Sequence, residues 1–188
     1  MHEDLSPLIA ATTHWLTSAY PASGGALASA LCEAQARQAV TAAARLRYPT
    51  PMDAALVMMS GPGGSARLDW IAGADGADGG DGGDGGDGAD TDDPDADAWR
   101  TWVDEVVLSW AACLLTDPEL AGRAMDALTE ATEPASTPPE FRRLVAPDDG
   151  DRRAAALLRH PDLLAPVSTL HHSQLLARLE EQGEASAA

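Results

Sequence analysis

The order of apolar and polar residues predicts two helices in the first fifty residues. Ser6 can cap a helix that begins at Pro7, and the residues after it repeat at helical spacing as far as Ala19. Pro21 should end this helix, and a second, alanine-rich helix is expected over residues 26–47, before a proline-rich stretch. The larger anchors of this second helix are expected to be Leu27, Leu31, Ala34 and Leu46.

Residues 54–72 are compatible with two structures. Two apolar runs flank the loop Gly61-Pro62-Gly63-Gly64, which is typical of two short strands joined by a glycine turn. Thr50 and Asp53, however, have the spacing of a capping box, with Pro51 as the first residue of a helix. The hairpin is the favoured prediction, and the helix remains open as its alternative.

The pattern changes at Gly73, where residues 73–90 read as six Gly-X-Asp triplets. Ten Asp and no basic residue lie between Asp75 and Asp97. A segment without large apolar residues cannot bury a core, so residues 73–97 are expected to form a disordered acidic linker. The triplets lack the recurring apolar residue of calcium-binding repeats, so no metal site is predicted.

Helical patterns return after this run. One helix is expected to start at Asp93 and reach Leu115, with Trp99, Trp102 and Trp110 on one face. Capping boxes at Thr116–Glu119 and Thr137–Glu140 predict one helix to about Glu130 and a short helix through Val145. Two more helices are expected over residues 150–159 and 168–182. Pro161 and Pro166 should lie in the connection between the last two helices, and residues 183–188 are expected to form a disordered tail.

The predicted fold is therefore mainly α, a bundle of short helices interrupted by a disordered Gly/Asp linker. Residues 1–72 form an N-terminal helical pair, plus a small β-hairpin if residues 54–72 adopt one. Residues 98–182 form a C-terminal helical bundle, which should pack with residues 1–72 as one unit. Neither part is rich enough in large apolar residues to form a core by itself.

The amino-acid composition excludes some kinds of functional site. The 188 residues carry a formal charge of −18, and all 12 basic residues are Arg. A phosphate-binding loop of the Walker type requires a lysine, so that class is excluded. Cys32 and Cys113 have no metal-binding spacing, and the expectation is that both are buried as small apolar side chains.

The five histidines have no spacing typical of a metal site, and no Ser or Cys lies in a nucleophile motif. No cofactor is therefore predicted. The N-terminus has no basic and apolar segments of the kind found in signal peptides, and no run of apolar residues is long enough for a membrane span. A cytoplasmic location is expected.

These observations favour a non-catalytic protein-interaction module, such as an adaptor, a regulator or an accessory subunit, with a protein partner. Two alternatives remain: an enzyme or enzyme-accessory protein with a pocket inside the bundle, and a DNA-binding regulator that uses its C-terminal arginines. Nucleic-acid binding is disfavoured because the basic residues are mixed with acidic ones. The residues expected to form an interaction surface are Trp99, Trp102, Arg142, Arg143, Arg152 and Arg153.

Overall fold

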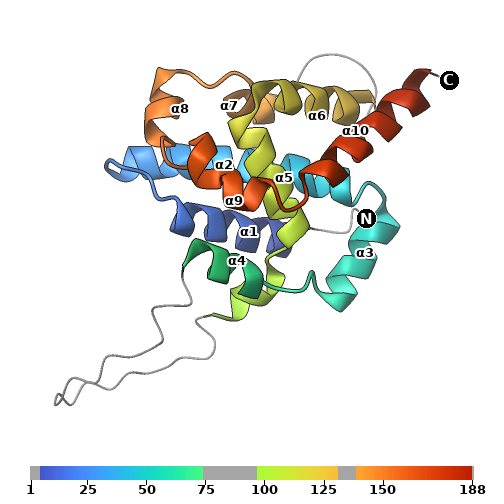
Figure 1. Cartoon of the computed structure of the whole chain (residues 1–188), viewed down its shortest axis with the longest axis horizontal. Coiled ribbons are helices and arrows are strands. Elements are labelled where there is room, and N and C mark those ends of the chain that lie inside the picture. Colours follow the sequence, from blue (N-terminus) through green and yellow to red (C-terminus); the bar gives the residue numbers. More distant parts are fainter. Residues whose placement is uncertain (1–4, 74–96, 131–138, 188) are drawn as a thin grey trace.

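A computed structural model describes residues 5–73, 97–130 and 139–187 of the chain (Figure 1). Residues 74–96 of the expected linker lie outside this part, and only its two ends are described. In chain order the elements are α1 (Ser6–Ala19), α2 (Ala26–Arg47), α3 (Pro51–Ser60), α4 (Ala66–Ala72), the 3₁₀ turn η2 (Ala98–Trp102), α5 (Glu105–Thr116), α6 (Pro118–Glu130), the 3₁₀ turn η3 (Pro139–Phe141), α7 (Arg142–Val145), α8 (Asp149–Ala154), α9 (Pro161–Ser168) and α10 (His172–Ala187). The prediction of a mainly α fold is confirmed.

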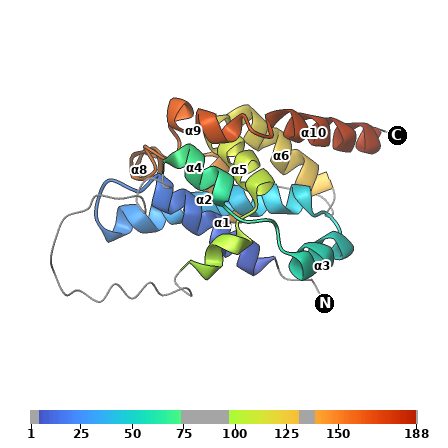
Figure 2. The same cartoon turned by 60° about the horizontal axis from the view of Figure 1, so that its bottom comes forward.

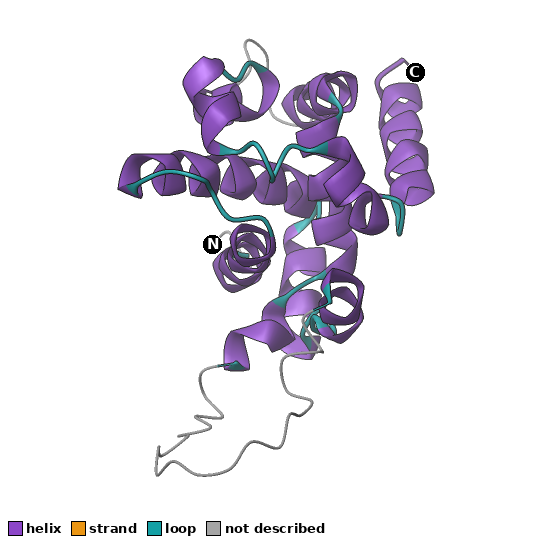
Figure 3. Ribbon diagram, turned by 60° about the vertical axis from the view of Figure 1, so that its left-hand side comes forward, coloured by secondary structure: helices purple, strands orange, loops and turns teal. Residues whose placement is uncertain are grey.

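The described residues contain no strand (Figure 3), so the hairpin predicted at 54–72 is wrong. The alternative prediction, a helix that starts at Pro51, is correct, because α3 starts with a complete capping box. The Thr50 hydroxyl accepts a hydrogen bond from the Asp53 backbone N–H at 3.2 Å, and the Asp53 carboxylate accepts one from the Thr50 backbone N–H at 3.1 Å. Two backbone donors at the start of the helix are thereby satisfied, which stabilises α3 over an extended strand.

The centre of the molecule is formed by α2 and α5, which pack against each other (Figure 2). Alanines occupy most of the buried side of α2, and these small side chains let neighbouring helices approach closely. Leu46 is fully buried on α2, but Leu27, which was expected to be an anchor, is 75% exposed. Helix α5 is buried on every side, since it also packs against α6 and α9. One cluster of buried residues thus joins the segments on either side of the acidic run.

The long helix predicted from Asp93 to Leu115 is interrupted in the structure. Residues 98–102 form η2, Val103 and Asp104 are extended, and α5 starts at Glu105. The cause is Asp104, whose carboxylate accepts hydrogen bonds from the backbone N–H groups of Val106 and Val107 at 2.9 and 3.0 Å. This cap stabilises a new helix start, and it turns η2 away from the axis of α5.

The C-terminal part contains a helix that was expected to be a connection. Helix α9 begins at Pro161, where a missing N–H costs nothing, and it accommodates Pro166 on its exposed side. Its Leu164 and Val167 are fully buried. Helix α10 extends to Ala187, so residues 183–187 are helical where a tail was expected. Among the described helices, none has both the length and the apolar composition needed to cross a bilayer.

Candidate functional site

A pocket of about 450 Å³ lies where α1, α4, η2 and α9 meet. We call it the Asp69 pocket, after the buried carboxylate in its lining. The C-terminal turn of α1 contributes Trp15 and Tyr20, α4 contributes Asp69, and η2 contributes Trp99 and Arg100. Leu163 and Pro166 of α9 complete the lining. The volume is in the usual range for small-molecule sites.

Asp69 holds three of the surrounding elements together. Its Oδ1 accepts hydrogen bonds from Trp15 Nε1 at 2.7 Å and from Arg100 Nη1 at 2.6 Å. Its Oδ2 accepts a hydrogen bond from the Ser65 hydroxyl at 2.7 Å. Asp69 is 9% exposed, so its charge is stabilised by these three donors rather than by water.

Arg100 is shared between two carboxylates. It donates to Asp69, and its Nε donates to Asp97 Oδ1 at 2.9 Å. These hydrogen bonds, first of all the one to Asp97, raise the pKa of the Arg100 guanidinium, which is therefore always charged. The guanidinium also stacks on Trp99, with its carbon 4.9 Å from the ring centroid. One cation and two anions leave this group of charges with a net charge of −1.

Aromatic rings form much of the remaining wall. Trp15 and Tyr20 meet edge to face, with ring centroids 6.4 Å apart and planes at 65°. Tyr20 is held by a hydrogen bond from its hydroxyl to the Leu163 backbone oxygen at 3.2 Å. Trp99 packs against His14 at 4.4 Å, with the planes at 79°. Each ring is therefore fixed in orientation before any ligand arrives.

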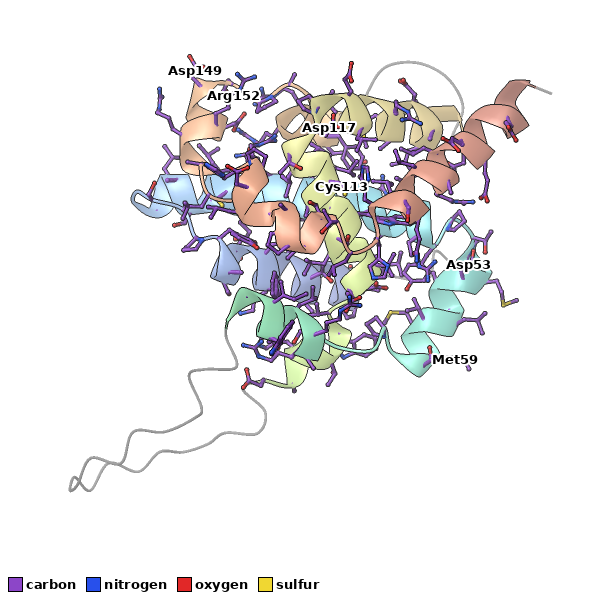
Figure 4. All side chains as sticks on the ribbon, in the orientation of Figure 1. Asp53, Met59, Cys113, Asp117, Asp149 and Arg152 are labelled. Carbon is purple, nitrogen blue, oxygen red and sulfur yellow. The ribbon has the colours of Figure 1, made fainter. Side chains whose placement is uncertain are left out.

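A second candidate surface lies on α3, at the edge of the molecule (Figures 1 and 2). Only Ala54 and Val57 of this helix are buried. Met52, Leu56 and Met59 are 68%, 55% and 83% exposed, and their spacing puts them on one side of the helix. We call these three residues the α3 face. Figure 4 shows Asp53 and Met59 near the two ends of this peripheral helix.

The residues predicted as an interaction surface lie in two separate places. Trp99 and Trp102 belong to η2, and both are half-buried against the core. The four arginines lie on α7 and α8, at the other end of the view in Figure 1. Whether either group binds a partner remains a prediction.

The four arginines differ in whether they form ion pairs with acidic side chains. Arg142 Nη2 lies 3.6 Å from Asp151 Oδ2 and 3.9 Å from Asp148 Oδ2, and Arg143 also pairs with Asp151, which is fully buried. Arg152, labelled in Figure 4, and Arg153 are exposed on α8, and neither has an ion-pair partner in the part of the chain that the structure describes. Of these four arginines, only Arg152 and Arg153 therefore have charges that are not paired with a carboxylate.

A smaller hollow of about 200 Å³ brings together Cys113, Asp117 and His172, residue types that occur in nucleophilic sites. The surroundings do not activate the thiol. Burial raises the pKa of Cys113 to about 11, and its thiol donates to the Ser168 backbone oxygen at 3.3 Å. At neutral pH Cys113 is therefore protonated and a poor nucleophile. Both cysteines are free and buried, as expected from the sequence.

Sequence reasoning missed the Asp69 pocket. Trp15 lies in the first predicted helix, and Asp69 lies in the segment 54–72 for which a hairpin was favoured, so no sequence pattern placed the two together. The only local signal was the pairing of Ser65 with an Asp four residues later, which is too common to indicate a site. In the described residues, no group of three or more His, Cys, Asp and Glu side chains could hold a metal ion.

Comparison with known proteins adds no family. No family model matches the chain, and no curated protein or solved structure is similar to it.

Proposed function

We propose that this protein is a non-catalytic interaction module whose α3 face binds an amphipathic helix of a partner protein. The observation that carries this proposal is the exposure of Met52, Leu56 and Met59 on one side of α3. Apolar side chains one and two turns apart on a helix suit the complementary stripe of a second helix. Two of the three are methionines, whose unbranched chains adapt to different contours.

The charges of this chain indicate which kind of partner helix would bind the α3 face. The only charged side chain on α3 is Asp53, and its carboxylate is engaged by the backbone N–H and the hydroxyl of Thr50. The face is therefore neutral, but the chain as a whole carries −18. A helix with an apolar stripe and basic flanks would be attracted from a distance, whereas a second copy of this chain would be repelled.

The size of the face supports a transient complex. Full burial of a Leu or Met side chain contributes about 1.5–3 kcal/mol, and these three are already partly covered. Each should therefore contribute about 1–2 kcal/mol to binding, or about tenfold in affinity. Three such side chains fall below the contact area of permanent complexes, and they are typical of weak regulatory encounters.

The test uses a photo-crosslinking amino acid at position 56, followed by identification of the crosslinked peptide. A synthetic peptide of that segment is then titrated against the wild type, Leu56→Glu and Leu27→Glu by fluorescence anisotropy. Leu27 is the matched control, because it is 75% exposed on α2 and its replacement changes the net charge equally. We expect a helix-forming segment that binds about tenfold or more weakly to Leu56→Glu and normally to Leu27→Glu.

Three results would contradict the proposal. One is crosslinking only to a second copy of the chain, with a dimer seen by sedimentation. Another is a peptide that binds Leu56→Glu and the wild type equally. The third is the recovery of no crosslinked protein at all from cells that contain the natural partners.

The two alternative functions have less support. For DNA binding, the charges of Arg142 and Arg143 are offset by Asp148 and Asp151, so the basic surface is small. For catalysis, the Cys113 thiol is protonated at neutral pH. A cytoplasmic location accords with the proposal, because two unpaired cysteines persist most readily in a reducing compartment.

A further inference from the structure

We propose that the Asp69 pocket binds a small organic cation of the quaternary ammonium class, with the charged group held against its aromatic walls. This site is distinct from the α3 face, and its occupation does not depend on a protein partner. Its volume of about 450 Å³ leaves room for a ligand with an apolar body as well as a charged head.

The balance of charge selects a cation over an anion. Among the described residues that line the pocket, Arg100 is the only basic one, and it already donates to Asp69 and Asp97. An anionic ligand would face the Asp69 carboxylate in the lining and would have to compete with Asp69 and Asp97 for the guanidinium. A cation would lie beside the buried Asp69 carboxylate, and the net charge of −18 would attract it from a distance.

The walls have the chemistry that holds cations. Trp15, Tyr20 and Trp99 present π-faces or edges from two different elements, and Trp faces attract cations most strongly. The protein already uses this combination internally, since Arg100 stacks on Trp99 at 4.9 Å and contacts Asp69 at 2.6 Å. A ligand cation would use the same kinds of group, namely Trp99, Trp15 and Tyr20 of the lining together with the Asp69 carboxylate.

The hydrogen bonds around Asp69 select the type of cation. The carboxylate already accepts from Trp15, Ser65 and Arg100. Since a carboxylate offers about four acceptor positions, it has little capacity left for the three N–H donors of a primary ammonium. A quaternary ammonium carries no N–H group, so it gains the electrostatic attraction without leaving buried donors unpaired.

The first experiment compares ligands on the wild-type protein, so it does not depend on the folding of any variant. Choline is titrated against its neutral isostere 3,3-dimethylbutan-1-ol and against ethanolamine, which has a primary ammonium. Binding is followed through the indole N–H signals in ¹⁵N NMR spectra. We expect choline to shift the signals of Trp15 and Trp99 but not that of Trp110, whose indole donates to the His171 backbone oxygen. Both comparison ligands should bind about tenfold more weakly.

The second experiment locates the site by mutation. Trp99→Leu should weaken choline binding about tenfold, whereas Trp70→Leu, at a position 72% exposed and outside the pocket lining, should leave it unchanged. Asp69→Asn keeps the size of the side chain and removes its charge, and it should also weaken binding. Equal binding of the neutral isostere, indole shifts confined to other tryptophans, or tighter binding of an anion such as acetate would each overturn the proposal.

Discussion

Replacement of Arg159 by methionine tests how the two sides of the acidic run are joined. Arg159 follows α8, and its guanidinium donates to acceptors on three other elements. Nε donates to Gln35 Oε1 of α2 at 2.6 Å, and Nη1 donates to the Leu115 backbone oxygen of α5 at 3.2 Å. Nη2 donates to the backbone oxygen of Arg143 in α7 at 2.7 Å. Burial lowers the pKa of Arg159, but an arginine remains charged throughout the accessible pH range.

The expected loss of stability follows from the hydrogen-bond acceptors that would lose the Arg159 guanidinium as their donor. Methionine keeps most of the apolar stem of Arg159, so the loss is mainly one of hydrogen bonding. Hydrogen bonds from a charged donor contribute about 1.5–3 kcal/mol each, and water can restore part of this loss. We therefore expect the free energy of unfolding to fall by about 3–5 kcal/mol, a large part of the total for a domain. The thermal midpoint should fall by roughly 6–20 °C.

The assay is urea unfolding followed by far-UV circular dichroism, which gives both the midpoint and the slope. Arg152→Met is the matched control, because Arg152 lies exposed on α8 and should change stability by less than about 0.5 kcal/mol. Arg159→Lys keeps the charge but loses the planar fork, so it should fall between the two. If Arg159→Met is as stable as Arg152→Met, Arg159 does not join these elements and the reasoning is wrong.

Two further predictions concern buried polar groups. Tyr48→Phe removes the hydrogen bond from the Tyr48 hydroxyl to Asp104 Oδ2, and it should destabilise the chain by about 1–2 kcal/mol in the same assay; an unchanged midpoint would refute this. Burial raises the pKa of the Cys113 thiol from 9.0 to about 11, so between these two pH values the thiol is protonated in the folded chain and largely ionised in the unfolded chain. Stability should therefore fall as pH rises from about 9 to 11, and Cys113→Ala should show a shallower fall in urea unfolding at several pH values; equal slopes would contradict the assignment.

Local signals predicted where several helices start. Pro7 lies in the first turn of α1, and the Asp117 carboxylate accepts a hydrogen bond from the Glu119 backbone N–H at 2.9 Å as α6 begins. Such caps depend on residues a few positions apart, so they can be read without knowledge of the rest of the fold. Asp104 caps α5 in the same way. The sequence pattern did not predict this cap, because the apolar stripe continues across Asp104 without a break.

The prediction for residues 54–72 failed for a different reason. It assumed that the apolar residues on either side of the glycine loop would pack inward as two strands. In the structure Leu56 and Met59 face solvent instead, while Ala54 and Val57 are buried. Where large apolar residues are exposed and small ones are buried, the periodicity no longer identifies the inner face.

The sequence by itself determined the mainly α class and several helix starts, because caps, prolines and helical spacing act over a few residues. The Asp69 pocket was decided by tertiary structure alone. Trp15 and Asp69 are 54 positions apart, and Arg100 lies beyond the acidic run, yet one carboxylate binds both side chains. Their meeting depends on how α1, α4 and η2 pack against one core, and no short-range pattern encodes that packing.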